Sequence, residues 1–186
     1  NKGGDYEYSL GLNGLGACAT QYSSAWFDAV IRRDGNKYSL HFEKGEIVGD
    51  MVKEPADRKK TGSCFRWRPD KEVFTEIDIP VDYYRDVLKR QAVVNPGITF
   101  KFRYQVGKKF EEEQFVYENG IRQYIEEMVG DNAFTMPVFW EAERRGRDAE
   151  NRPEMKLKIT ASFCFSKQVS CVEYYHNSSW LEYGGS

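Results

Sequence analysis

The chain has 186 residues, of which 40% are hydrophobic and 30% are charged, and its formal net charge is −2. This length and composition are typical of a globular protein with one domain or two small ones. The nearly neutral charge argues against general electrostatic binding to nucleic acid, and no apolar run is long enough to span a membrane. We therefore expect a cytoplasmic protein without membrane contact.

The four cysteines show neither a CxxC pair nor the ligand spacing of a zinc site, which favours reduced thiols and predicts no metal site. Both ends of the chain, NKGGDYEY and LEYGGS, are polar and rich in glycine. Such ends are typical of loops, so the sequence indicates a piece of a longer protein.

The first half of the chain predicts a glycine-rich loop, a short helix and several strands. Small residues follow the glycines of YEYSLGLNGLG and predict the start of a helix. Apolar residues then alternate with polar ones on both sides of Asp34-Gly35, which predicts a hairpin across residues 25–45 with its turn at that dipeptide. TGSCFRWRPD predicts a further strand that ends at Pro69, because proline cannot donate to a strand ladder.

Apolar residues at helical spacing predict a helix over residues 81–94, closed by Pro96-Gly97. ITFKFRY, residues 98–104, alternates regularly and predicts a strand. The charged segment QVGKKFEEEQ that follows is expected to be a turn, and it is the best candidate for a domain boundary.

The last part predicts an amphipathic helix near residues 121–128 and a strand in FTMPVFWEAER. RRGRDAENRPE is expected to be a polar loop, and MKLKITASFCF, residues 155–165, is the most regular strand pattern. VSCVEYY is expected to pair with that strand. The fold class is thus α/β (α+β), with two successive layered parts.

The glycines Gly11, Gly14 and Gly16 have two interpretations. They allow backbone N–H groups to approach an anion at a helix start, or they serve turn geometry alone. A dinucleotide fingerprint is excluded, since the upstream strand and the ribose-binding acid are missing.

Five motifs in the same order as in a known family decide between these interpretations. They stand as YEYSLGLNGLG, GSCFRWRPD, LKRQAVVNPGITF, FVYENGI and HNSSWLEYGGS. The set resembles the B subunits of bacterial DNA gyrase and topoisomerase IV, which carry a GHKL-type ATPase followed by a transducer domain.

The resemblance implies two parts in this chain. Residues 1–105 would be the C-terminal half of the GHKL ATPase domain, a partial two-layer α/β sandwich that includes the ATP lid. Residues 106–186 would be the N-terminal part of the transducer, with a ribosomal-protein-like βαβ fold.

The resemblance also implies roles for individual residues. Tyr6 matches the lid tyrosine that touches adenine, Ser63 takes the place of a threonine that serves adenine through water, and Arg33 matches an arginine at the rim of the inhibitor pocket. The phosphates would be bound by backbone N–H groups of Gly11, Leu12, Asn13, Gly14, Leu15 and Gly16. For Ser63 the alternative is a strand-edge hydroxyl, and for Arg33 a solvated arginine of the hairpin.

The lid departs from the family pattern in several places. Glu7 replaces a lysine, Asp5 lies near the place of a second lysine, Leu10 replaces a glycine and Asn13 replaces a histidine. A negative charge near phosphates costs affinity. These changes indicate an altered lid or a harmless exposed charge.

The intact protein would use ATP and Mg²⁺, whose base and metal ligand lie upstream of the lid in the resembled family. The chain alone is therefore expected to have no catalytic residue and to hydrolyse no ATP. Glu43, Glu72 and Glu118 are interpreted as exposed or structural carboxylates. In the intact enzyme the implied partners are DNA, the gyrase A or topoisomerase IV A protein, and a second copy of the B protein in a homodimer.

The arginines near residues 144–152 could contact DNA, but the carboxylates between them favour a solvated loop. Two other functions remain open. One is a GHKL ATPase of the mismatch-repair or chaperone type, and the other is a non-catalytic α/β interaction module.

Overall fold

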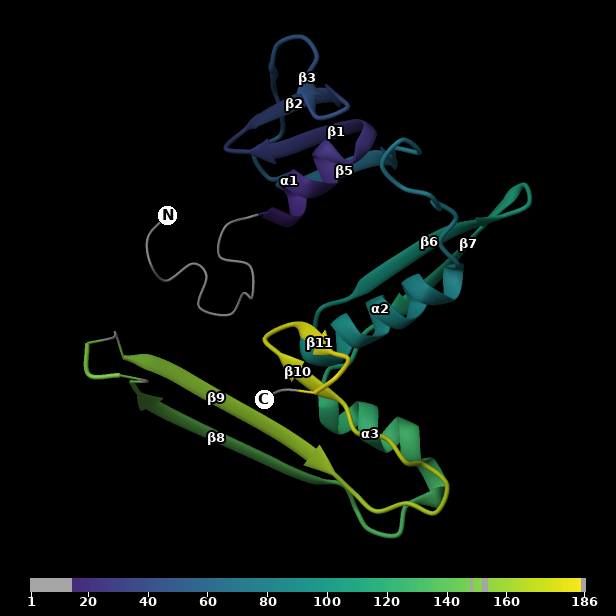
Figure 1. Cartoon of the computed structure of the whole chain (residues 1–186), viewed down its shortest axis with the longest axis vertical. Coiled ribbons are helices and arrows are strands. Elements are labelled where there is room, and N and C mark those ends of the chain that lie inside the picture. The colour runs from purple at the N-terminus through teal and green to yellow at the C-terminus, as the bar shows by residue number, and fades with distance from the viewer. Residues whose placement is uncertain (1–14, 148, 152–153, 185–186) are drawn as a thin grey trace. The chain divides into compact units, whose positions relative to one another are not determined.

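The computed structural model describes residues 15–147, 149–151 and 154–184. They form two compact units, of which unit 1 ends at Ile79 and unit 2 begins at Pro80 (Figure 1). None of the described helices is long and apolar enough to cross a membrane. The domain boundary predicted at residues 105/106 falls inside a strand of unit 2, and as a functional division it stays a prediction.

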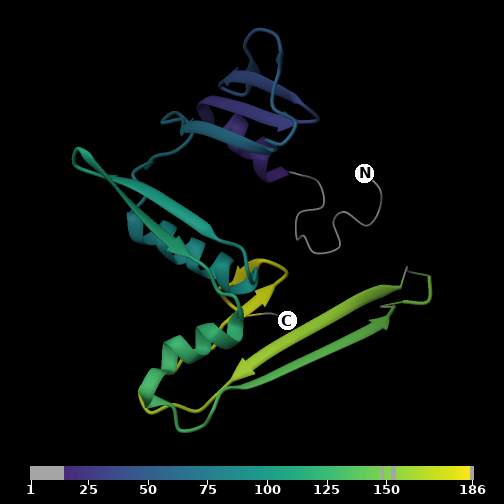
Figure 2. The ribbon, with the colours of Figure 1, turned by 180° about the vertical axis from the view of Figure 1, so that it is seen from behind.

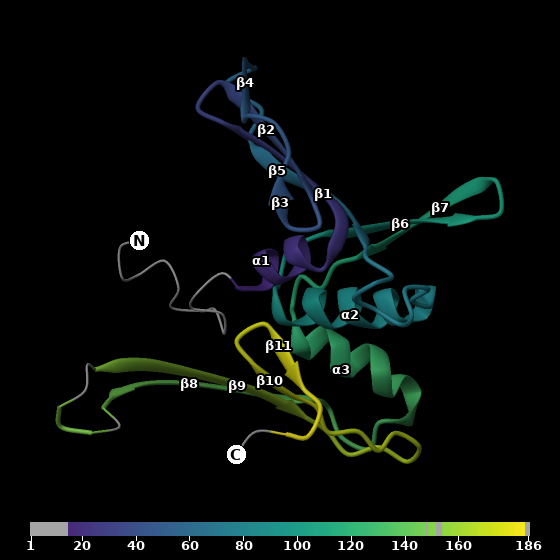
Figure 3. The ribbon, with the colours of Figure 1, turned by 45° about the horizontal axis from the view of Figure 1, so that its top comes forward.

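Unit 1 is a small antiparallel sheet with one helix, and it confirms the predicted hairpin and the strand after it. Its elements are α1 (Leu15–Tyr22), β1 (Ser24–Arg33), β2 (Asn36–Glu43), β3 (Glu46–Ile47), β4 (Val52–Pro55) and β5 (Gly62–Pro69). The sheet has five strands in the order β3-β2-β1-β5, with β4 also paired to β2 (Figure 3). Asp34 and Gly35, in the turn between β1 and β2, have positive φ of 53° and 74°. Aspartate and glycine tolerate such φ values better than most residues, as the sequence pattern predicted.

One face of this sheet carries a cluster of aromatic side chains. The register places Phe27 opposite Phe42 on β2 and Trp67 on β5. The Phe27 ring, which is 6% exposed, lies 6.2 Å from the ring of Phe42 and 5.8 Å from that of Phe65. Phe65 and Trp67 are nevertheless 46% and 50% exposed. This apolar face is therefore only partly covered within unit 1.

The aspartate of RWRPD has a structural role. Asp70 is buried, and its Oδ1 accepts a hydrogen bond of 2.9 Å from the backbone N–H of Glu72. Its own N–H donates to the carbonyl of Ser23 at 3.0 Å. Asp70 thus turns the chain after β5 and ties this turn to the junction of α1 and β1.

Among its described residues, unit 2 contains two α-helices and three separate antiparallel strand pairs. Its elements are α2 (Val81–Val94), β6 (Phe100–Val106), β7 (Lys109–Phe115), α3 (Ile121–Val129), the 3-10 turn η1 (Gly130–Asn132), β8 (Val138–Gly146), β9 (Met155–Phe163), β10 (Tyr174–His176) and β11 (Ser179–Leu181). Both predicted helices are confirmed. The structure is a mixed α+β fold with antiparallel sheets.

The charged segment after residue 104 is not a simple turn, and that prediction is wrong. β6 and β7 form a hairpin, in which Tyr104 pairs with Glu111 and only Gly107-Lys108 make the turn. The run of Lys and Glu hid the strand pattern of β7 in the sequence. The last residue of β7, Phe115, is apolar and pairs with Phe100. Charged residues are tolerated there because most of β7 is exposed.

The predicted pairing of VSCVEYY with residues 155–165 is also wrong. β9 pairs with β8 along their whole length. The two strands form a ribbon that Figure 2 shows from the back of the view in Figure 1. The end of VSCVEYY instead enters β10, which pairs with β11 around a turn where Asn177 has φ of 52°. β8 continues to Gly146, so Arg145 and Gly146 lie in a strand and not in the expected loop, while Arg144 lies at the end of the strand that FTMPVFWEAER predicted.

Three of the sequence motifs meet in one packed cluster in unit 2. The core consists of Ala92, Val93 and Tyr117, which are 0%, 1% and 5% exposed. Gly97, of the NPG turn, donates from its backbone N–H to the carbonyl of Tyr117 at 3.2 Å. Ser178 donates from Oγ to Oδ1 of Asn95 at 3.2 Å, which joins the β10–β11 turn to the end of α2.

Candidate nucleotide-binding site

The described residues contain only the end of the predicted phosphate loop. Tyr6, Gly11, Leu12, Asn13 and Gly14 lie outside the described residues, as do Asp5, Glu7 and Leu10. Leu15 and Gly16 are the first described residues, and they belong to α1, which agrees with the predicted helix.

The amides at the start of a helix generally suit an anion. The first amides of a helix have no intrahelical acceptor and carry partial positive charge. No heavy atom within the described residues lies within 4 Å of the place that a Cβ on Gly16 would occupy. The Gly16 carbonyl accepts a hydrogen bond of 2.9 Å from Oγ1 of Thr20, on the side of the turn away from these amides.

Ser63 and Arg33 share one face of the unit 1 sheet. Ser63 on β5 lies opposite Ile31 on β1, and Arg33 is two residues further along β1. Side chains opposite each other, or two apart on one strand, point to the same face. The structure thus brings together two predicted site residues from separate strands, on the partly open apolar face.

Within the part of the chain that the structure describes, the ion-pair partner of Arg33 is the adjacent Asp34. Its Nε lies 3.4 Å from Oδ2 of Asp34, and the two side chains are 80% and 83% exposed. An ion pair this exposed contributes little to stability and is easily exchanged for another partner. The contact with Asp34 therefore does not fix the guanidinium in one position.

The opposite face of the same sheet carries a polar pair that the sequence analysis missed. Asp28 and His41 lie opposite each other, and His41 Nδ1 is 2.6 Å from Asp28 Oδ1. His41 Nε2 also lies 3.6 Å from Oε1 of Glu43. The hydrogen bond with Asp28, helped by Glu43, raises the pKa of His41 above its ordinary value of 6.5. The register set by the Asp34-Gly35 turn was the signal that could have found this pair.

The raised pKa predicts a pH dependence of the stability of unit 1. The stabilisation by protonated His41 is fully present below about pH 6.5 and is lost as the pH rises through the raised pKa of the folded state. We expect the difference in melting temperature between the unchanged chain and His41→Gln to be largest near about pH 5.5 and to shrink above about pH 8. Thermal unfolding followed by circular dichroism across this range measures it, and a difference that grows with pH would contradict the assignment.

The three carboxylates Glu43, Glu72 and Glu118 lie in ion pairs or are exposed. Glu72 forms an ion pair of 2.7 Å with Lys44, Glu43 lies beside His41, and Glu118 is exposed. Within the described ranges, no group of three His, Cys, Asp or Glu side chains is arranged to hold a metal ion. Arg144 donates to the backbone carbonyl of Glu143 at 3.0 Å, while Arg152 lies outside the described residues.

Comparison with known proteins gives a consistent set of relatives, although no model of a known protein family matches the chain. The chain is 33% identical over 131 residues to the B protein of DNA gyrase from Synechocystis, a match that covers 69% of this chain and 12% of that protein. It is 31% identical over 126 residues to the B protein of DNA topoisomerase 4 from Escherichia coli, covering 67% of this chain and 20% of that protein. The chain thus spans a fifth or less of the length of these two relatives.

Solved structures show a similar fold. The 43K ATPase domain of Thermus thermophilus gyrase B, in complex with an aminocoumarin, matches 78% of this chain and 39% of that chain with a TM-score of 0.60 and 23% identity. The topoisomerase IV ATP-binding domain of Francisella tularensis, in complex with a small-molecule inhibitor, matches 76% and 38% with a TM-score of 0.57 and 24% identity. At these identities the likeness shows the fold alone.

Proposed function

Because the chain is a distant homologue of the B proteins of DNA gyrase and topoisomerase IV, we propose that it forms part of the ATPase and transducer region of a type II DNA topoisomerase. Residues 1–105 would supply the second half of the nucleotide-binding domain, with its lid, and residues 106–186 the first part of the transducer. In the whole protein this region would couple ATP binding and hydrolysis to passage of one DNA segment through another.

The observation that carries the proposal is the shared position of Ser63 and Arg33. Both lie on the apolar face of unit 1, where Phe65 and Trp67 are about half exposed. Large aromatic side chains on an open sheet face are typical of a surface that another part of the protein or a ligand covers. An adenine ring bound above this face would have apolar contact below it and a hydroxyl and a guanidinium at its edge.

Each proposed contact uses a different chemical property. The amides from Gly11 to Gly16 would donate hydrogen bonds to phosphate oxygens at the start of α1. The Ser63 hydroxyl and Tyr6 would orient the adenine, and Arg33 would lie at the outer rim. Of these proposed donors, Leu15, Gly16, Ser63 and Arg33 lie within the described residues.

Magnesium does not fit the described residues, because they offer no cluster of ligands for it. Mg²⁺ prefers carboxylate, carbonyl and water oxygens in octahedral geometry. In the proposed whole protein the ion would be held by residues outside this chain.

The proposal predicts that nucleotide binding needs flanking sequence. We expect isothermal titration of the 186-residue chain with ATP and Mg²⁺ to show no saturable binding. The same chain extended at both ends by its flanking coding sequence is expected to hydrolyse ATP. Turnover by the short chain would contradict the assignment of the missing groups, and an inactive extended protein would contradict the proposed function.

Two single substitutions refine this test in the extended protein. We expect Ser63→Ala and Arg33→Met to raise the KM for ATP or the Kd of an aminocoumarin, because both side chains are on the proposed nucleotide face. Cys64→Ala is a matched control, since Cys64 follows Ser63 on β5 and points to the opposite face. An equal effect of all three substitutions would indicate a general change in the sheet.

The DNA, the gyrase A or topoisomerase IV A protein and a second copy of the B protein are proposed partners of the whole protein only. The alternative GHKL ATPases and the non-catalytic interaction module differ from the proposal in the flanking sequence. A Glu-x-x-x-Asn box followed by Asp-x-Gly-x-Gly upstream in the same reading frame would exclude the interaction module. An acidic Toprim-like motif downstream would exclude the mismatch-repair and chaperone types.

A further inference from the structure

We propose that Arg85 is a positioning residue that makes helix α2 and the β6–β7 hairpin move as one body. The inference rests on the proposed function in one respect. That function places the predicted boundary at residues 105/106, inside β6, so the hairpin that Arg85 would hold to α2 crosses this boundary.

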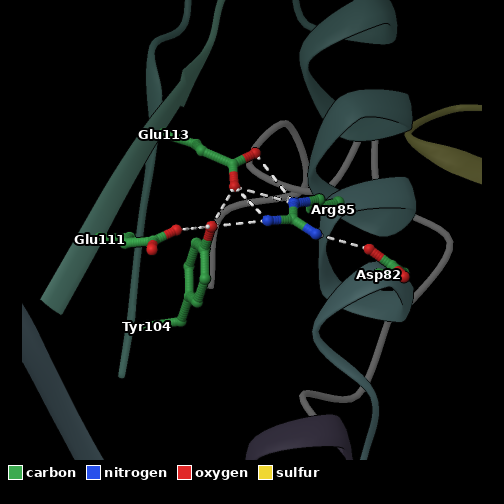
Figure 4. Close-up of polar contacts among 5 residues, drawn as sticks. All are labelled: Asp82, Arg85, Tyr104, Glu111 and Glu113. Carbon is green, nitrogen blue, oxygen red and sulfur yellow. Dashed lines mark hydrogen bonds and ion pairs between the residues drawn. The ribbon is translucent and has the colours of Figure 1, made fainter. Parts of the chain in front are cut away.

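The connection is a fork-shaped ion pair between α2 and β7. Arg85 Nε lies 2.8 Å from Oε1 and 3.0 Å from Oε2 of Glu113, and Nη2 lies 2.6 Å from Oε1 (Figure 4). Two N–H groups that bind one carboxylate fix both its distance and its orientation. The two side chains are 34% and 31% exposed, so solvent screens the pair less than it screens most surface pairs.

Tyr104 extends this pair to β6. Arg85 Nη2 donates to the Tyr104 hydroxyl at 2.6 Å, and the hydroxyl is 2.7 Å from both Oε1 of Glu113 and Oε2 of Glu111. The two carboxylates raise the pKa of Tyr104 to about 12, and Arg85 lowers the pKa of Glu113. The hydroxyl therefore keeps its proton and Glu113 stays ionised throughout the neutral range. Arg85 Nη1 also donates to Oδ1 of Asp82 at 2.5 Å. Figure 4 shows Asp82 on the side of the guanidinium away from Glu113.

The position of Arg85 along α2 explains why one side chain can control the hairpin. The base of the hairpin, Phe100 and Phe115, packs against the core at Ala92 and Val93. Arg85 precedes Val93 by two helical turns, which is about 12 Å along the axis. Two attachments that far apart fix the direction of the hairpin, whereas attachment at the base alone would let it pivot.

The hairpin has few other restraints within the described residues. β6 and β7 pair only with each other there, and a two-stranded hairpin by itself is marginally stable in water. Tyr84 on α2 adds an aromatic contact with Phe102, with ring centroids 5.9 Å apart. Beyond Tyr104 the strand residues on both sides are exposed, including Val106 and Phe110. The Arg85 cluster thus lies where the hairpin leaves the helix.

Hydrogen exchange of the 186-residue chain, followed by mass spectrometry without nucleotide, tests the connection. A hairpin released from α2 should open more often, because two strands alone are marginally stable, so we expect Arg85→Met to speed exchange of the β7 amides about fivefold. Exchange of α2 near Val93 and of β1 should change less than about twofold. Arg85→Lys is expected to restore only part of the protection, because an ammonium cannot form the fork. Asp82→Asn is the matched control, since it removes an 85% exposed partner of the same guanidinium, and it should change exchange less than about twofold.

A double-mutant cycle separates a connection from general stability. If Arg85 acts through Glu113, then Arg85→Met combined with Glu113→Gln should exchange no faster than the more affected single variant. Additive effects, unchanged exchange of β7 in Arg85→Met, or equal acceleration throughout unit 2 would each overturn the inference. Because no nucleotide is used, the result is independent of the ATP titration that tests the proposed function.

Discussion

Replacement of Phe27 by alanine is expected to lower the free energy of unfolding of unit 1 by about 3 kcal/mol. Phe27 is 6% exposed and its ring contacts the rings of Phe42, Phe65 and Trp67. Removal of the ring takes away the apolar contact that joins β1 to both neighbouring strands, and the sheet has few other buried side chains to compensate. Urea unfolding followed by pulsed hydrogen exchange of β1 and β2 reports on unit 1 separately from unit 2.

Phe65→Ala is the matched control for Phe27→Ala. Phe65 lies on the same face, opposite Ala29, but it is 46% exposed. Its replacement should cost about 1 kcal/mol, because much of its surface is already in contact with water. Equal effects of the two substitutions would mean that the apolar face is covered uniformly, which contradicts a partly open face.

The second large effect is expected at Gly120, in the FVYENGI motif. Gly120 has φ of 54°, and a Cβ there would lie 2.9 Å from Cγ of Pro96 and 3.1 Å from the carbonyl oxygen of Val93. Gly120→Ala should therefore lower the free energy of unfolding of unit 2 by about 3 kcal/mol, through backbone strain and displacement of the core together. The measurement is urea unfolding followed by hydrogen exchange of α2.

The opposite end of α3 supplies the control for this prediction. Gly130 has φ of 45° and ψ of −134°, close to the 54° and −132° of Gly120, but no described atom lies within 4 Å of its Cβ position. Gly130→Ala should show the backbone cost alone, about 2 kcal/mol, because alanine rarely adopts this positive φ. If both variants lose the same stability, the packing of Gly120 against Pro96 contributes nothing.

The sequence correctly predicted the elements that short stretches of neighbouring residues determine. The helix over residues 81–94 and the turn at Asp34-Gly35 agree with the structure because spacing and turn residues determine them directly. The β7 strand was missed because Lys and Glu occupy most of its positions, and alternation cannot be seen where both faces are polar. The partner of β9 was wrong because two nearby segments had strand character, and pairing depends on the turn between β8 and β9.

The candidate site shows the same division. Sequence similarity indicated Ser63 and Arg33, but only the register of β1 and β5 shows that they share a face. The pairs Asp28–His41 and Arg85–Glu113 join residues 13 and 28 positions apart, and neither belongs to any motif. The Asp28–His41 pair follows from the register that the Asp34-Gly35 turn sets, whereas the Arg85–Glu113 pair depends on the packing of α2 against the hairpin, which spacing does not contain. The proposed lid changes, Glu7 and Leu10, lie outside the described residues.

The central claim is that ATP binds above the face of unit 1 that carries Ser63. Methyl NMR of the chain extended at both ends tests it directly, since Ile31 lies on that face and the adjacent Val30 on the other. Addition of a non-hydrolysable ATP analogue should shift the Ile31 methyl signals and leave those of Val30 nearly unchanged. Saturable binding that shifts Val30 and not Ile31 would contradict the account.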